Sequence, residues 1–195
     1  LNGSYVIEGT LNSVNQWYNT DAVVKPLGSY DKIKSGTDWV DSITVSNSVS
    51  NVNVQLKNSA TGEITSVLAN LEIKSDSIIP VITVTGNTSE WKKQETFSIL
   101  ALAGISGIKS VTVNGTDITS TYGNGYTITQ NGTYVFIVTS NAGLTATKVV
   151  NIINIDNTKP ENPVITGKDN YTSAKWYNTD QTITASFATT PGSPE

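Results

Sequence analysis

The chain is built from short stretches in which apolar and polar side chains alternate. The clearest stretches lie between residues 80 and 155, where runs such as Val111-Thr112-Val113 and Tyr134-Val135-Phe136 are separated by Asn-Gly pairs. Alternation with a period of two is typical of half-buried β-strands, and Asn-Gly favours tight hairpins. About seven strands of this kind, with frequent turn signals, predict an immunoglobulin-like β-sandwich in this region.

A tryptophan-centred motif recurs along the chain. Residues 17–21 and 176–180 both read Trp-Tyr-Asn-Thr-Asp, and Trp91 takes the equivalent place between them, 74 and 85 residues from the other two tryptophans. Pro80 and Pro160 mark the joints between copies, because proline is excluded from central strands. The pattern predicts an all-β fold of tandem immunoglobulin-like β-sandwich domains in an elongated array. The expected repeats span residues 1–77 and 78–157, and residues 158–195 form the truncated start of a third repeat.

The same alternation predicts which side chains lie inside. We expect the three motif tryptophans to pack in the core or at its edge. In the second repeat we expect one buried cluster, made of Trp91, Phe97, Tyr134, Phe136, Val138 and Ile152.

In the truncated third repeat, Ile183, Ala185 and Phe187 share one face of a strand. Two strands alone leave an apolar face and free edges in water. We therefore expect strand pairing with another chain through residues 160–195.

Composition narrows the functional classes. The chain has 195 residues, a formal net charge of −4, and no His, Cys or Met, while Ser, Thr and Asn make up roughly a third of it. The absence of His and Cys removes the common Ser–His and Cys–His catalytic arrangements and nearly excludes a zinc site. Nucleic acid is an unexpected partner because its binding needs a basic patch. Membrane insertion is unexpected because no apolar run is long enough.

Several segments of both repeats resemble a known family. They are residues 111–117, 126–134, 140–143 and 154–156 of the second repeat, and residues 28–30, 38–39 and 56–65 of the first. Together they resemble the bacterial immunoglobulin-like tandem repeats of Firmicutes (Gram-positive) cell-surface proteins. The resemblance implies the sandwich fold and an extracellular location at the cell wall or cell surface. It implies no catalytic residue, because the family shares none.

Candidate contact and modification residues are few. Tyr18 and Tyr177 follow the motif tryptophans and are expected on the opposite, wet face, and Tyr30 and Trp39 belong to a segment specific to the first copy. These four are the possible partner-facing residues.

Two further chemistries, calcium binding and an isopeptide bond, compete with a purely structural role for some residues. Asp156, Asn157 and Glu161 at the second joint offer oxygen ligands for calcium, although a solvated linker explains them more simply. Lys25 and Lys148 were considered for an intramolecular isopeptide bond, and Lys25 is expected to point outward. No cofactor is expected.

The favoured function is a non-catalytic structural spacer or stalk that projects another domain from the cell surface. The alternative is an adhesin or host-protein-binding module that holds a host glycan, matrix protein or immunoglobulin. A third reading is a set of accessory repeats on a secreted glycosidase. In each reading the chain itself is not an enzyme, and any partner is a protein or a glycan.

Overall fold

The computed structural model describes residues 4–86, 89–159, 161–166, 176–180 and 182–186. Regular structure in this part of the chain consists of β-strands and a single 3-10 turn, Tyr122–Asn124. The all-β prediction is therefore confirmed. The prediction for Phe187 lies outside the described residues.

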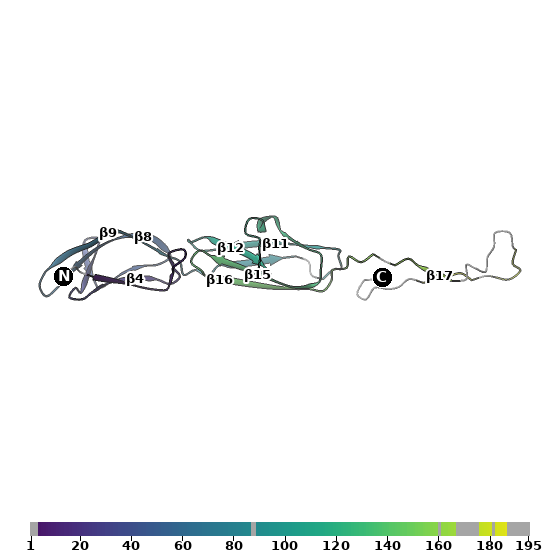
Figure 1. Cartoon of the computed structure of the whole chain (residues 1–195), viewed down its shortest axis with the longest axis horizontal. Coiled ribbons are helices and arrows are strands. Elements are labelled where there is room, and N and C mark those ends of the chain that lie inside the picture. The colour runs from purple at the N-terminus through teal and green to yellow at the C-terminus, as the bar shows by residue number, and fades with distance from the viewer. Residues whose placement is uncertain (1–3, 87–88, 160, 167–175, 181, 187–195) are drawn as a thin grey trace. The chain divides into compact units, whose positions relative to one another are not determined.

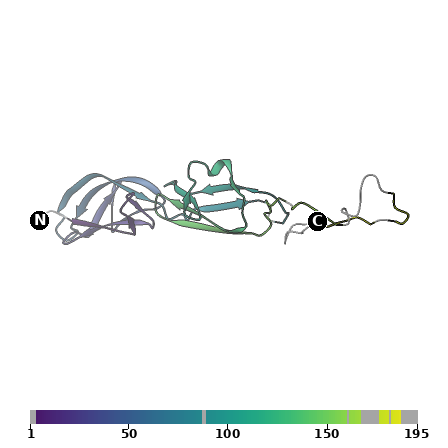
Figure 2. The same cartoon turned by 45° about the vertical axis from the view of Figure 1, so that its right-hand side comes forward.

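The first half of the chain folds into two facing sheets. A three-stranded sheet has the order β1-β4-β7, and a six-stranded sheet has the order β2-β3-β9-β8-β5-β6. Figures 1 and 2 show β4 on the opposite side of this sandwich from β8 and β9. The strands are β1 Ser4–Glu8, β2 Leu11–Asn12, β3 Trp17–Tyr18, β4 Ala22–Leu27, β5 Lys32–Ser35, β6 Asp38–Val40, β7 Ile43–Val45, β8 Ser48–Lys57 and β9 Ile64–Ser75.

Residues 81–152 repeat the same plan. One sheet has the order β10-β11-β14 and the other the order β13-β12-β15-β16, which matches β1-β4-β7 and β6-β5-β8-β9 strand for strand. The strands are β10 Val81–Thr85, β11 Glu95–Leu102, β12 Ile108–Val113, β13 Thr116–Asp117, β14 Tyr126–Ile128, β15 Gly132–Ser140 and β16 Thr145–Ile152. The two stretches are therefore copies of one sandwich topology.

The division of the chain into compact units differs from its division into two sandwiches. One compact unit comprises residues 1–85, 97–126 and 134–150, and the other comprises residues 86–96, 127–133 and 151–195. These limits do not fall at residues 77 and 157, so the predicted repeat boundaries stay predictions. The first unit holds the whole first sandwich and most of the strand residues of the second.

Alternating burial in the strands builds both cores. In β11 every second residue from Glu95 to Ala101 is buried, which is the period expected when one face of a strand meets a core. In the second sandwich the Phe97 and Phe136 rings meet edge to face with centroids 5.8 Å apart. The first core consists of Ala22, Val24, Tyr30, Ile33, Val45, Val52, Val54, Leu56 and Ile73.

The predicted core of the second sandwich needs one correction. Phe97, Phe136, Val138 and Ile152 are buried, and Tyr134 is half-buried, but Trp91 is 40% exposed. The neighbouring Lys92 forms a parallel bridge to Ile155, as Tyr18 does to Ser75 in the first sandwich. After Trp17 and Trp91, it is thus the following residue that pairs with the chain at or beyond the end of the last strand.

The described part of residues 158–195, predicted as the start of a third repeat, contains a small two-stranded sheet. Val164–Thr166 (β17) pairs antiparallel with Thr184–Ser186 (β18). Ile165 and Ile183 are exposed, and Trp176 is 98% exposed, so the expectation of core packing fails for this tryptophan. Pairing of residues 160–195 with another chain stays a prediction.

Replacement of Phe136 by alanine tests the core of the second sandwich. Phe136 is fully buried, so Phe136→Ala should lower the free energy of unfolding by about 3–5 kcal/mol. Leu100→Ala is the matched control, because Leu100 lies on the exposed face of β11. Chemical denaturation gives both values. Equal losses in the two variants would mean that the inward face is assigned wrongly.

Candidate functional site

The two joints of the chain share one pattern. Asp76 precedes Pro80 and Asp156 precedes Pro160 by the same four positions. The backbone N–H of Asp76 donates to the Tyr18 carbonyl at 2.9 Å, and that of Asp156 donates to the Lys92 carbonyl at 2.8 Å. Each last strand therefore leaves its sandwich beside the residue that follows the motif tryptophan, and an aspartate stands at the exit.

At the first joint the Asp76 carboxylate is fully buried, with 0% exposure. Its Oδ1 accepts a hydrogen bond of 3.1 Å from the Ile78 N–H in its own linker. Its Oδ2 accepts one of 2.8 Å from the Ser106 N–H, in the loop after β11. Burial of an ion without partners is costly, and hydrogen bonds to the charged form offset that cost. The carboxylate thus joins the linker to the second sandwich.

Gly104 makes this approach possible. A Cβ at position 104 would lie 2.2 Å from Asp76 Oδ1, which is inside van der Waals contact. The backbone of this glycine does not need a positive φ, so the requirement is one of space. Any side chain at Gly104 must push the carboxylate away from the loop.

Amide groups surround this carboxylate contact. The side chains of Asn12 and Asn15 donate to the Asn141 carbonyl at 3.4 and 3.1 Å. The Asn141 side chain in turn donates to the Ser106 carbonyl at 2.8 Å, and the Ala142 N–H donates to the Ser106 hydroxyl at 3.3 Å. Neutral hydrogen bonds therefore connect several segments at the first joint. None of these groups is a cation that could pair with the Asp76 carboxylate.

The linker itself is fixed on its other side. Ser75 Oγ donates to the Thr20 carbonyl at 2.9 Å, and the Ser77 N–H donates to Asn47 Oδ1 at 2.7 Å. Residues on both sides of Asp76 are thus held to the first sandwich. Rotation about the linker would break these bonds.

At the second joint the candidate calcium ligands are used in local hydrogen bonds. Asp156 Oδ1 accepts from the Thr158 N–H at 2.9 Å and also from its hydroxyl. The Asn157 side chain donates to the Thr129 carbonyl at 3.0 Å, and Glu161 is exposed. No group of three or more acidic, His or Cys side chains comes together within the described residues. The calcium hypothesis gains no support from this geometry.

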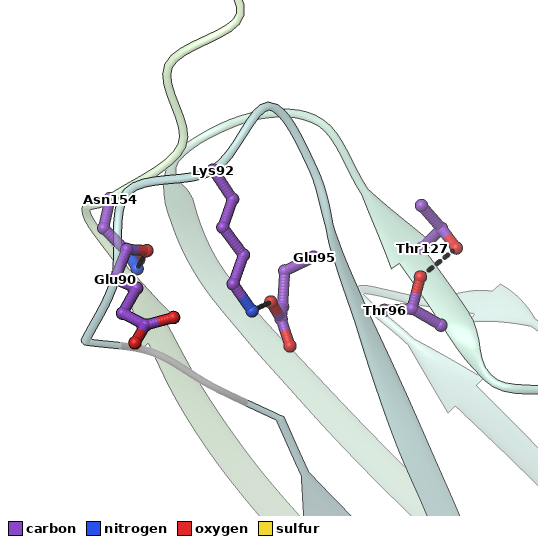
Figure 3. A network of polar contacts seen from close by, with 6 residues as sticks. All are labelled: Glu90, Lys92, Glu95, Thr96, Thr127 and Asn154. Carbon is purple, nitrogen blue, oxygen red and sulfur yellow. Dashed lines mark hydrogen bonds and ion pairs between the residues drawn. The ribbon is translucent and has the colours of Figure 1, made fainter. Parts of the chain in front are cut away.

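A network of polar contacts, in which Glu95 and Asn154 are buried, lies near the second joint (Figure 3). Lys92 Nζ is 2.6 Å from Glu95 Oε2, and the two side chains are 32% and 7% exposed. The Asn154 side chain donates to the Glu90 carbonyl, while its own Oδ1 is buried without a partner among the described residues. The Thr96 and Thr127 hydroxyls are 2.8 Å apart. The network places Lys92 where the first sandwich has Tyr18, and its ammonium compensates the buried Glu95.

Of the predicted partner-facing residues, Tyr30 belongs to the first core and Tyr18 is half-buried against it. Tyr18 packs against the first core, and burial raises the pKa of its phenol. Tyr30 is 6% exposed; its hydroxyl donates to Glu63 Oε1 at 2.9 Å, and this hydrogen bond raises the pKa of the phenol. Tyr30 lies in the loop between β4 and β5, where its ring joins the first core.

The other two predicted residues keep some exposure. Trp39 is half-buried, and Lys57 Nζ lies 5.8 Å from the centre of its ring, within cation–π range. Tyr177 is half-buried too. Tyr30 and Trp39 contact different residues of the first sandwich, Glu63 and Lys57. Lys25, considered for an isopeptide bond, pairs with Glu8 at 2.5 Å on the outside, and Lys148 is exposed.

Sequence reasoning missed Asp76 and Gly104. The available signal was the repeated spacing between aspartate and proline at both joints. Gly104 carried no signal, because a need for space between two distant segments leaves no mark on the local sequence.

Comparison with known proteins gives little. No family model matches the chain, and no curated protein matches it. Among solved structures, the fibronectin(III)-like modules of CbhA from Clostridium thermocellum are similar, with 12% identity and a TM-score of 0.36 over 79% of this chain and 95% of that one. In the part of the chain that the structure describes, no helix is long and apolar enough to cross a membrane.

A double-mutant cycle tests the contact between Asp76 and Gly104. Gly104→Ala should destabilise the protein, because its methyl group displaces the carboxylate. Asp76→Ala should cost about 1–3 kcal/mol, because it leaves two amide donors unpaired. In the Asp76→Ala background Gly104→Ala should cost less, with a coupling energy of about 0.5–3 kcal/mol by chemical denaturation. Additive losses would contradict the contact.

The pair of Lys92 and Glu95 gives a second stability test. Lys92→Ala leaves the buried Glu95 carboxylate without its ammonium partner and should cost about 1–3 kcal/mol, a range for lost hydrogen bonds to charged groups. Lys93→Ala is the matched control, because Lys93 is exposed. Thermal unfolding compares the two variants. A Lys92→Ala loss no larger than that of the control would show that the pair does not matter.

Proposed function

We propose that this chain is a non-catalytic stretch of β-sandwich repeats that serves as a semi-rigid spacer in a bacterial cell-surface protein. The single observation that carries the proposal is the buried Asp76 carboxylate at the first joint. A flexible linker would leave a carboxylate in water, whereas this one exchanges water for N–H groups of two successive segments. Such a joint resists bending, because bending exposes unpaired amides and a buried ion.

The repeated topology supports the same role. A spacer gains length by adding copies of one sandwich, and the two described sandwiches share their strand order. The Cys-free composition rich in Ser, Thr and Asn agrees with an extracellular location in a Gram-positive bacterium. The location and the type of organism remain part of the proposal.

A second candidate function is an adhesin or host-protein-binding module. The first sandwich favours it because Trp39 and Lys57 present a cation–π pair on the outer face of its larger sheet. Aromatic and cationic side chains of this kind are enriched at protein interfaces.

The rigidity of the first joint can be measured directly. The chain has no Cys, so Ala60→Cys and Thr147→Cys, both at exposed positions, give one spin-label pair across the joint. Pulsed electron paramagnetic resonance should give a narrow distance distribution in this parent protein. Adding Asp76→Ala should broaden it, because the linker loses both amide contacts of the carboxylate.

Asp38→Ala is the control for this experiment, because Asp38 is an exposed aspartate in the first sandwich. It should leave the distribution narrow. A parent distribution as broad as that of the Asp76→Ala variant would argue for a flexible tether and against a spacer.

A further inference from the structure

The first sandwich has a groove on its larger sheet. The groove has a volume of about 770 Å³ and lies against the middle of β8, and β7, the end of β5 and residues 66–69 of β9 also line it. Its lining includes Lys34, the segment from Ser50 to Gln55, and Ile43 to Val45. This volume is within the usual range of ligand sites, about 300–1,000 Å³.

The groove exists because β5 leaves β8 early. Among the described residues the register of β5 with β8 is confined to Lys32↔Lys57 and Ile33↔Leu56. The equivalent strands of the second sandwich, β12 and β15, pair from Ile108↔Ser140 to Val113↔Phe136. The first sandwich therefore leaves β8 without a strand neighbour on this side along its first eight residues.

An open strand edge has a specific chemistry. Every second residue of such an edge directs its backbone N–H and C=O outward, where an added strand can pair with them. On the other side β8 is paired with β9 over nearly its whole length, so the edge is held in strand conformation before any partner arrives. Pre-organisation of this kind lowers the cost of binding.

The lining indicates what kind of strand fits. Val45, Val52 and Val54 form an apolar floor, while Asn51, Asn53 and Ser66 supply polar groups at the rim. Lys34 is the only charged residue in the lining, and among the described residues it forms no ion pair. It lies opposite Trp39 in the register of β5 with β6. The charge of the groove is complementary to an acidic side chain.

We propose that the groove binds an extended segment of a partner protein, which adds to the free edge of β8 and sets an acidic side chain against Lys34. The added strand runs beside residues 50–54 and spans about five residues, or roughly 17 Å at the usual rise per residue. The β-bulges where the register of β8 shifts, between Val52 and Val54 and between Val54 and Gln55, limit the length of strand that can pair. This function goes beyond the spacer and does not depend on it.

The test uses the full chain, labelled with nitrogen-15, and two nine-residue peptides of alternating Val and Thr. One peptide carries Glu at its centre and the other carries Lys. The Glu peptide should shift the amide resonances of residues 50–54 and of Lys34, and should bind about tenfold more tightly than the Lys peptide, which corresponds to about 1.4 kcal/mol. A Glu peptide N-methylated at alternate positions should not bind, because it lacks the donors for strand pairing.

Lys34→Glu should reverse the preference between the two peptides, whereas Lys148→Glu, at an exposed position in the second sandwich, should leave it unchanged. Absence of shifts at residues 50–54 at millimolar peptide would overturn the proposal. So would equal binding of the N-methylated peptide, or shifts of the same resonances on raising the concentration of the chain alone, which would assign the edge to a second copy. The spin-label experiment on Asp76 is unaffected by any of these outcomes.

Discussion

Burial of one apolar face from each of two facing sheets is the constraint on which the rest of this structure depends. A β-strand has only two faces, so a strand that gives Val24 or Phe136 to the core must give its neighbours to the surface. The rule fixes both cores, and it also explains the errors in the predicted aromatic positions. Tyr18 pairs with Ser75 and Lys92 pairs with Ile155, so the residue after the tryptophan, and not the tryptophan itself, takes the paired position. Trp91 is left partly exposed.

The joint at Asp76 extends this packing through polar contacts. Apolar residues could connect two sandwiches by adhesion alone, but such a contact allows sliding. A buried carboxylate that accepts from Ile78 and Ser106 allows one arrangement, because any other leaves it unpaired. Gly104 shows how closely the two partners approach. Specific geometry at a joint is what a spacer needs and what a binding surface does not require.

The two sandwiches share a topology but differ in how far one pair of strands runs together. In the second sandwich β12 covers β15 along most of its length, whereas in the first sandwich β5 covers only the end of β8. Within the described residues, the same sheet order therefore occurs with a longer strand pairing in the second sandwich and with a free edge of β8 in the first.

The sequence by itself determined that the fold is all-β and identified most of the second core. Alternation over Val111 to Val113 and over Tyr134 to Val138 is a local property, and local patterns survive in a single sequence. Only the tertiary structure decided that Tyr30 is buried on Glu63, that Gly104 is needed for space beside Asp76, and that β8 has an open edge. Each of these depends on segments that meet only after folding, and their spacing along the chain carries no trace of the contact. The physical reason is that strand phase and strand pairing are set by the partners across a sheet and between sheets.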